Sequence, residues 1–309
     1  MKILITGSNG LLGQKLVYKL RNNKNVTCIA TARGKNRLIN QNEYIYETLD
    51  ITNEQSVANV FKKNMPDVII NTAAMTNVDA CETEKELALL MNATSVNYQI
   101  KTLEFLKKEN PDYNPHFIHL STDFIFDGTH GPLDENEKPN PLSYYAETKL
   151  EAEKIVMSSK LDWAIARTVL VFGIVDNMSR SDIVLWVKSN LEQGKKINVV
   201  DDQFRTPTLA EDLADGCILI AEKRAKGIYN ISGKEFYSIL ELAQAVADYY
   251  HLDKSLINPS RSADIKQPAK RPPITGFIID KAKSDLGYNP HSFIEGIQIL
   301  EDQIKAMGK

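Results

Sequence analysis

The stretch "KILITGSNGLLG" (Lys2 to Gly13) joins a strand-like apolar run to a leucine-rich helical run through glycines at every third position, Gly7, Gly10 and Gly13. A strand, a glycine turn and a helix in this order bring unpaired backbone N–H groups and the positive end of a helix dipole to one point. A pyrophosphate fits such a point. The glycines alone do not separate this interpretation from a tight turn in an α/β domain that binds no cofactor.

The same alternation continues outward from this stretch. Strand-like runs at 26–32, 67–74 and 116–122 are separated by helical patterns, the longest of them "ELALLMNATSVNYQIKTLEFLKKEN" (residues 86–110). Strands that alternate with helices predict an α/β fold with a doubly wound parallel sheet, a Rossmann fold. In such a fold ligands bind at the carboxyl ends of the strands, and unusual polar or glycine-rich sequences follow several of these strand ends.

The second half of the chain is less regular. We expect an NAD(P)-binding Rossmann domain at residues 1–168 and a smaller α/β substrate-binding lobe at 169–309, with some segments (about 195–232) returning to the Rossmann sheet. A helix is expected around Ile183 to Gln193 and a strand at "KINVV" (196–200).

Composition excludes several classes of function. The chain has 309 residues, a net charge of −3 and a pI near 6.0, so no basic face for nucleic acid or an anionic membrane is expected. The sequence has no long apolar span or secretory signal, which predicts a cytoplasmic protein. Its three cysteines, Cys28, Cys81 and Cys217, lack metal-site or redox spacing and are expected to be reduced and buried, and no metal site is predicted.

The loop after the second strand bears on cofactor choice. A protein that selects NAD usually places an acid there, whereas this chain has "ATARGKNR" (residues 30–37). Arg33, with Lys35 and Arg37 nearby, can bind a 2′-phosphate through charge-assisted hydrogen bonds. This favours NADPH, with NADH as the alternative; a solvated basic loop that binds nothing stays open.

Tyr145 and Lys149 form the first candidate catalytic pair. They lie four residues apart at the start of a helix that Ser143 is expected to cap, so they share a helix face. Tyr145 can donate a proton to a ketone oxygen while a hydride arrives, and a nearby ammonium favours the phenolate that remains. Tyr144 competes for this role, but the residue four positions after it is Thr148 rather than a lysine.

A hydroxyl pair follows a strand between the glycine loop and the tyrosine. In "LSTDFIFDG" (residues 120–128), Ser121 or Thr122 can hydrogen-bond a substrate carbonyl and the alkoxide that develops from it. A Ser-Thr-Asp turn would explain this segment alone. It would not explain the order of all three motifs, so we take Thr122 as the third catalytic candidate.

With these motifs in place, the chain resembles the extended short-chain dehydrogenases/reductases and, among them, the dTDP-4-dehydrorhamnose reductase (RmlD-like) family. The resemblance covers about the first half of the chain and continues weakly in "DDQFRTPT" (201–208) and "RPP" (271–273). The segments that carry it are "GSNGLLG" (7–13), "PDVIINTAAMTNVDACE" (66–82), "LLMNATSV" (89–96), "STDFIFDG" (121–128) and "YAETKLEAEK" (145–154).

The resemblance implies roles for particular positions. The implied cofactor contacts are Gly10, Leu11 and Leu12 at the pyrophosphate, Asp50 and Ile51 at the adenine, Ala73, Ala74 and Met75 in the middle, Asn92 near the cofactor, and Tyr145 and Lys149 at the nicotinamide ribose; the implied substrate contacts are Thr122, Asp123, Leu170 and Arg271. Asn92 is alternatively a polar residue that interrupts a helix. The substrate positions depart most from the family: Leu170 stands where an aromatic is usual and Arg205 where a glycine is usual.

The activity that this resemblance implies is the NADPH-dependent reduction of the 4-keto group of a nucleotide-linked 4-keto-6-deoxy sugar, in the biosynthesis of dTDP-L-rhamnose or a related polysaccharide sugar. A nucleotide-sugar epimerase or dehydratase is less favoured, since a dehydratase usually follows its threonine with Asp-Glu and here Phe124 follows Asp123. A non-catalytic NADP-binding partner, similar to the regulatory β-subunit of methionine adenosyltransferase, is the alternative from another class. The sequence leaves the oligomeric state open, with a homodimer among the candidates.

Overall fold

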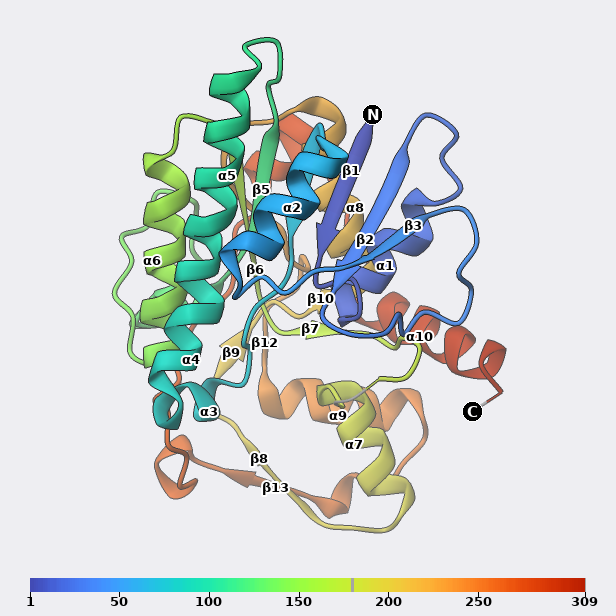
Figure 1. Cartoon of the computed structure of the whole chain (residues 1–309). Helices are drawn as coiled ribbons and strands as arrows, with labels where there is room; N and C mark the ends of the chain where they lie inside the picture. The colour runs from blue at the N-terminus through green and yellow to red at the C-terminus, as the bar shows by residue number, and fades with distance from the viewer. Residues whose placement is uncertain (179–180, 309) are drawn as a thin grey trace.

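A computed structural model describes residues 1–178 and 181–308, and within this part of the chain seven parallel strands form one sheet (Figure 1). Their order is β11-β6-β5-β4-β1-β2-β3. The strands all run parallel, and the order in which the chain adds them switches from one side of β1 to the other between β3 and β4. The bounds are β1 Lys2–Thr6, β2 Thr27–Ala32, β3 Ile45–Thr48, β4 Val68–Asn71, β5 His116–Thr122, β6 Asp162–Thr168 and β11 Gly227–Asn230. The predicted doubly wound fold is confirmed.

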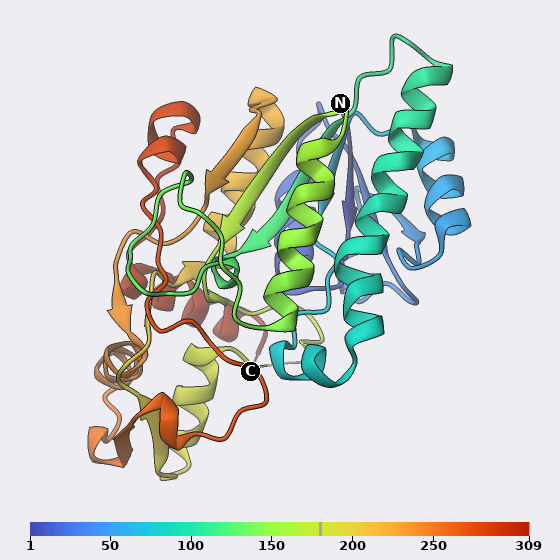
Figure 2. The ribbon, with the colours of Figure 1, turned by 90° about the vertical axis from the view of Figure 1, so that its left-hand side faces the viewer.

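Helices cover both faces of this sheet, as Figure 2 shows from the side of α5 and α6. One face carries α1 (Leu11–Leu20), which packs against α8 (Ala210–Lys223). The other carries α2 (Glu54–Asn64), α5 (Ser95–Glu109) and α6 (Tyr144–Ser158). Because both faces are covered, β4 and β5 are buried along their whole lengths. The core of β4 is the apolar run Val68–Ile70, whereas β5 also buries polar side chains, among them His116 and His119.

The connection before α5 contains an irregular turn. Short helices α3 (Val78–Thr83) and α4 (Lys85–Leu89) lead into a π-helical turn at Leu90–Thr94, which continues directly into α5. The long helical pattern of the sequence is therefore correct in extent, but one wide turn interrupts it. Such turns are frequent at functional sites.

The C-terminal part builds a second apolar core below the sheet (Figure 1). Its helices are α7 (Ile183–Glu192), α9 (Ile239–Tyr249) and α10 (Phe293–Ala306), and its short strand pairs join β7 (Val171–Phe172) to β10 (Thr208–Leu209), β9 (Phe204–Arg205) to β12 (Tyr237–Ser238), and β8 (Ile197–Val200) to β13 (Ile257–Ser260). Between residues 195 and 232, β8 belongs to this lower part, whereas β11 is a strand of the large sheet and α8 packs on that sheet.

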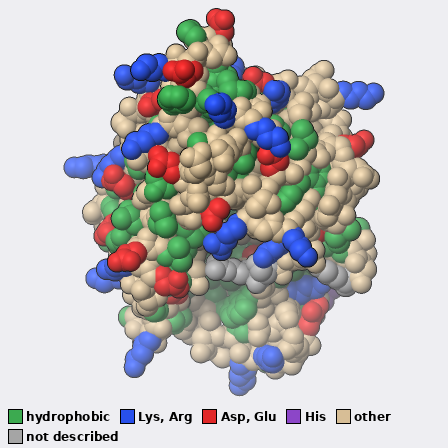
Figure 3. All heavy atoms as spheres, viewed as in Figure 1, with side chains coloured by type: hydrophobic (Ala, Val, Ile, Leu, Met, Phe, Trp, Pro, Cys, Tyr) green, Lys and Arg blue, Asp and Glu red, His purple; other side chains and the backbone are tan. Residues whose placement is uncertain are grey.

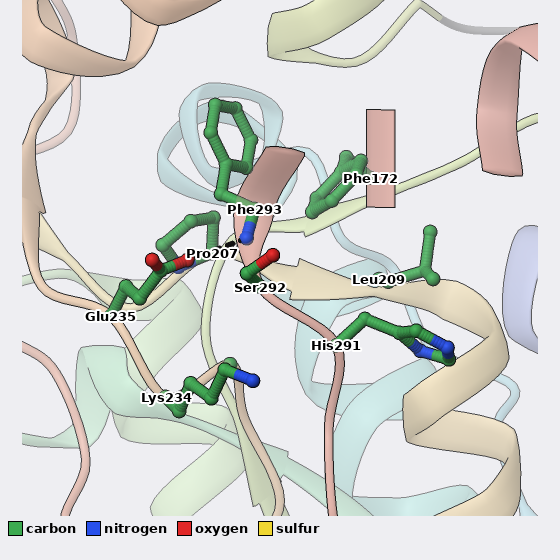
Figure 4. Close-up of a pocket in the computed structure, with 9 residues that line it drawn as sticks. Phe172, Pro207, Leu209, Lys234, Glu235, His291, Ser292 and Phe293 are labelled. Atoms are coloured by element: carbon green, nitrogen blue, oxygen red, sulfur yellow. Dashed lines mark hydrogen bonds between the residues drawn. The ribbon is translucent and has the colours of Figure 1, made fainter. Parts of the chain in front are cut away.

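The start of α10 lies beside a small pocket, where it packs within the lower core and also contacts α8 (Figure 4). The Phe293 ring meets the Phe172 ring edge to face, with centroids 5.3 Å apart, and the Phe293 backbone N–H donates to the Glu235 carboxylate. His291 Nδ1 lies 2.7 Å from Asp212 Oδ1 on α8. The His291–Asp212 contact holds the lobe against α8, which packs on the sheet.

No helix among the described residues is long and apolar enough to cross a membrane. Positive and negative side chains are interspersed over the face seen in Figure 3. The three cysteines are all buried, as expected from the sequence.

Candidate active site

A cleft of about 1100 Å³ runs along the carboxyl ends of the strands, between the sheet and the C-terminal lobe. The loops after β1, β2, β4, β5 and β6 all reach it. It is lined by nearly all of the residues singled out from the sequence: Gly7, Gly10, Leu11, Leu12, Gly13, Arg33, Asp50, Ile51, Ala73, Ala74, Met75, Thr122, Asp123, Tyr145, Lys149, Leu170 and Arg271. Asn92 is the exception, because it lies behind the cleft wall.

The glycine loop has the geometry of a phosphate cradle. Gly7 adopts a φ of +70°, a conformation that favours glycine. A Cβ on Gly13 would lie 2.3 Å from the Gly7 carbonyl oxygen, so only glycine lets α1 start this close to the loop. Gly10 occupies the N-cap of α1 and offers no side chain to the first-turn N–H groups. The residues present therefore fit a pyrophosphate at the start of α1.

The basic loop after β2 is held by a residue that the motif analysis did not single out. Asn9 donates from its amide to the Lys35 carbonyl at 2.9 Å and accepts from the Arg37 N–H at 2.9 Å. Arg33 is exposed at the cleft, and both Arg33 and Arg37 line it. Asn9 thus ties the basic loop to the glycine loop. Its position inside the glycine run was the only sequence signal for it.

Asn92 supports the cleft wall from behind. Its Oδ1 accepts from the Met75 N–H at 2.7 Å, and its Nδ2 donates to the Met75 carbonyl at 3.1 Å and to Thr148 Oγ1 at 3.0 Å. The π-helical turn directs this side chain at the loop after β4. The structure therefore places Asn92 in contact with Met75 and α6 rather than along the cleft surface.

Tyr145 and Thr122 meet at the centre of the cleft. Ser143 caps α6, as predicted, by accepting from the Ala146 N–H, and Tyr145 follows in the first turn. The Tyr145 hydroxyl hydrogen-bonds the Thr122 side chain, and the Phe124 ring packs edge-on against it at 6.1 Å. Burial raises the pKa of Tyr145 above its ordinary value, an effect larger than the opposing hydrogen bond.

This raised pKa differs from the expectation that Lys149 would favour the phenolate. Burial is the largest cause, and Lys149 Nζ is engaged elsewhere: it donates to the Leu120 carbonyl at 2.6 Å and lies 3.2 Å from His119 Nε2. Burial also lowers the pKa of Lys149 to about 8. Tyr145 is consequently held as the phenol, the form that can donate a proton.

Asp123 is enclosed by partners from the lobe. It accepts from Thr122 Oγ1 at 3.0 Å and from the Thr275 hydroxyl, and Arg205 Nε lies 3.6 Å from its carboxylate. Burial raises the pKa of Asp123, an effect that Arg205 opposes. Arg205 itself is buried and donates to the carbonyls of residues 204, 272 and 273. Arg205 was noted in the sequence only as a departure from the family.

The remaining substrate candidates line the lobe side of the cleft. Leu170 has a φ of +37°, a strained conformation for a branched residue, just after β6. Arg271 forms a two-pronged ion pair with Asp79 at 2.7 and 3.2 Å, which joins the segment before residue 274 to α3. The Arg271 guanidinium is thus already paired with a carboxylate of the protein. Leu170 contributes an apolar side chain to the cleft lining.

A doubly wound sheet with a glycine cradle and a Tyr-Lys pair at its carboxyl edge defines an oxidoreductase of the short-chain dehydrogenase/reductase class. The family model described as the RmlD substrate binding domain matches residues 1–305, and the chain belongs to this family. The crystal structure of a dTDP-4-dehydrorhamnose reductase from Clostridium acetobutylicum superposes with a TM-score of 0.84 at 28% identity, over 99% of this chain and 100% of that one.

Curated relatives include both enzymes and a subunit. The probable low-salt glycan biosynthesis reductase of Haloferax volcanii is 28% identical, over 97% of each chain. The methionine adenosyltransferase 2 subunit beta of Xenopus tropicalis is 31% identical, over 84% of this chain and 75% of that protein.

Proposed function

We propose that this protein reduces the 4-keto group of a nucleotide-linked 4-keto-6-deoxy sugar with NADPH. The observation that carries the proposal is the meeting of Tyr145, Lys149 and Thr122 in the same cleft as the glycine cradle. Membership of the RmlD family and the similarity to reductases support the sugar as substrate. The product would serve dTDP-L-rhamnose or related polysaccharide biosynthesis.

In this proposal the bound cofactor supplies a hydride to the sugar carbon C4. Tyr145 donates its phenolic proton to the ketone oxygen, so that a hydride and a proton together convert the C=O group into an alcohol. The Thr122 hydroxyl, whose one proton is directed at Asp123 in this structure, would turn to donate that hydrogen bond to the developing alkoxide. The Lys149 ammonium, which lines the same cleft, would stabilise the phenolate that remains, until a solvent proton restores the phenol.

The proposed choice of NADPH depends on the loop after β2. Arg33 and Arg37 line the end of the cleft beyond the glycine cradle, where the adenosine ribose of a dinucleotide would lie. Guanidinium groups bind phosphate oxygens through paired hydrogen bonds. Hydrogen bonds from Thr52 lower the pKa of Asp50, so this carboxylate stays ionised. Asp50 and Ile51 would contact the adenosine.

The test is a direct assay. Purified protein is mixed with NADPH and dTDP-4-keto-6-deoxy-L-mannose or its UDP counterpart, and the absorbance of the reduced cofactor is followed. We expect oxidation with at least one of these sugars. If the protein binds NADPH but oxidises it with none of them, the reductase proposal is wrong.

A second candidate follows from the 31% identity to subunit beta of methionine adenosyltransferase 2. In this case the protein would bind the cofactor without turnover and associate with a methionine adenosyltransferase catalytic subunit. Size-exclusion chromatography of the mixture tests this function. A stable complex together with no NADPH oxidation would favour the subunit role, whereas oxidation without a complex favours the reductase.

A further inference from the structure

His119 lies directly beneath the proposed catalytic lysine. It belongs to β5, three residues before Thr122, and is 1% exposed. Its Nε2 is 3.2 Å from Lys149 Nζ, which also donates to the Leu120 carbonyl at 2.6 Å. An ammonium has three N–H bonds. With two of them directed at His119 and Leu120, the third is left for the cleft that Lys149 lines.

Asn71 of β4 holds the other side of the ring: its Nδ2 lies 3.1 Å from His119 Nδ1, and its Oδ1 accepts from Gln99 Nε2 at 3.2 Å. The nitrogen and oxygen of an amide are told apart by their hydrogen-bond partners, so the amide turned by 180° must also be considered. A neutral imidazole has one donor and one acceptor nitrogen. An acceptor atom of Asn71 at Nδ1 therefore leaves Nε2 as the acceptor nitrogen facing Lys149, whereas a donor atom at Nδ1 makes Nε2 the protonated nitrogen. If the Asn71 oxygen accepts the Nδ1 proton, Nε2 is free to accept a hydrogen bond from the ammonium.

The residues around Asn71 allow its amide to turn over, so that Oδ1 instead of Nδ2 faces His119 Nδ1. Thr6 Oγ1, 2.6 Å from the Asn71 amide, can either donate or accept. Gln99 Oε1 is buried and has no hydrogen-bond partner among the described residues. If both amides turn over, Gln99 Oε1 accepts from Asn71, at the cost of the 3.3 Å hydrogen bond from Gln99 Nε2 to the Ser95 carbonyl.

The hydrogen-bond partners of the Lys149 ammonium are His119 and the Leu120 carbonyl, and neither is charged. The charged group that acts on Lys149 is Glu153 on α6, while Tyr145, Asp123 and Arg205 line the same cleft. Glu153 pairs with Arg167 at 2.7 Å, and Asp123 faces Arg205. Among the described residues no carboxylate forms an ion pair with Lys149, so neutral acceptors hold the ammonium.

We propose that His119 is a positioning residue of the reductase reaction: its neutral imidazole, anchored by Asn71, accepts a hydrogen bond from Lys149 Nζ and aims the ammonium into the cleft. Burial lowers the pKa of His119 well below its ordinary value, so the ring stays neutral as this role requires. The inference rests on the proposed reductase function, and its test therefore includes a measurement that needs no turnover.

The kinetic test compares His119→Leu with His119→Gln, whose amide oxygen can replace Nε2 as an acceptor. His116→Leu is the matched control, because His116 is equally buried on β5 but lies at the amino end of the strand, away from the cleft. We expect His119→Leu to lower kcat about tenfold or more, in line with the loss of one hydrogen bond to a charged group. KM for NADPH should change little, and His119→Gln and His116→Leu should retain most of the activity.

The pH dependence of kcat/KM provides a second measurement, which a simple loss of packing would leave unchanged. In the wild-type protein we expect kcat/KM to fall as the pH rises through about 8, because burial lowers the pKa of Lys149 to about that value. Without the acceptor the charged form is less stable, so the pKa of Lys149 falls and the basic limb moves to lower pH by about one unit in His119→Leu. An unshifted limb, or equal losses in His119→Leu and either other variant, would overturn the proposal.

Histidine 15N NMR tests the same contact without substrate. The chain has five histidines, and the His119 signals are those that His119→Gln removes. At pH 6 we expect Nε2 of His119 to be unprotonated, and Lys149→Met to change the tautomer. A protonated Nε2 that does not respond to Lys149→Met would refute the role of His119, while an inactive protein with the expected spectra would refute only the reductase function.

Discussion

Tyr145 combines a buried hydroxyl with a hydrogen bond to Thr122, and burial keeps its pKa high. Tyr145→Phe removes the proton donor but retains the ring that packs on Phe124. We expect turnover to fall by about a hundredfold or more, since general acid catalysis typically contributes that much. NADPH affinity, measured by fluorescence titration, should stay within about threefold. Unchanged turnover would mean that another group supplies the proton.

Arg33 tests the choice of cofactor. It is exposed at the cleft, so Arg33→Ala should leave the fold intact and remove one guanidinium from the proposed 2′-phosphate site. We expect NADPH affinity to fall by about tenfold or more and NADH affinity to change little. Lys24→Ala, at an exposed lysine outside the cleft lining, is the control. Equal losses for both cofactors would show that Arg33 does not recognise the phosphate.

At the level of secondary structure, the N-terminus of α6 sets the position of Tyr145. Ser143→Ala removes a cap whose loss typically costs about 1 kcal/mol of stability. Ser292→Ala removes the capping box of α10 in the lobe and serves as the matched control. We expect similar losses in the free energy of unfolding, measured with urea, but a several-fold loss of kcat only for Ser143→Ala. Equal kcat values in both variants would show that the cap does not position the tyrosine.

For the whole molecule, the cleft lies between the sheet and the C-terminal lobe and is lined by both, for example by Gly10 and by Gln203. A ligand that binds only the folded state stabilises it by about 2.7 kcal/mol at one hundred times its Kd. We expect saturating NADPH to raise the thermal unfolding midpoint by several degrees, and equimolar NADH to raise it less. Calorimetry measures both midpoints. No shift with NADPH would contradict cofactor binding in this cleft.

The elements that sequence patterns predict well are those with local causes. Strand-helix alternation follows from the period of apolar residues, and the Tyr145–Lys149 pair follows from the helical repeat and from Ser143 as a cap. The glycine spacing predicts the cradle because two of its glycines have causes within the loop: Gly13 lies against the Gly7 carbonyl, and Gly7 has a positive φ. These features needed no knowledge of the other strands.

Contacts between residues far apart in the chain could not be read in the same way. His119 lies 30 residues from Lys149 and 48 from Asn71, and Arg205 reaches Asp123 only because the lobe folds back onto the sheet. The direction of the tyrosine pKa also depended on these contacts, because burial is its largest cause and Lys149 donates to the Leu120 carbonyl. Local periodicity therefore specified the strands, the helices and the residues that end them, whereas the packing of the elements set the partners, burial and protonation of those residues.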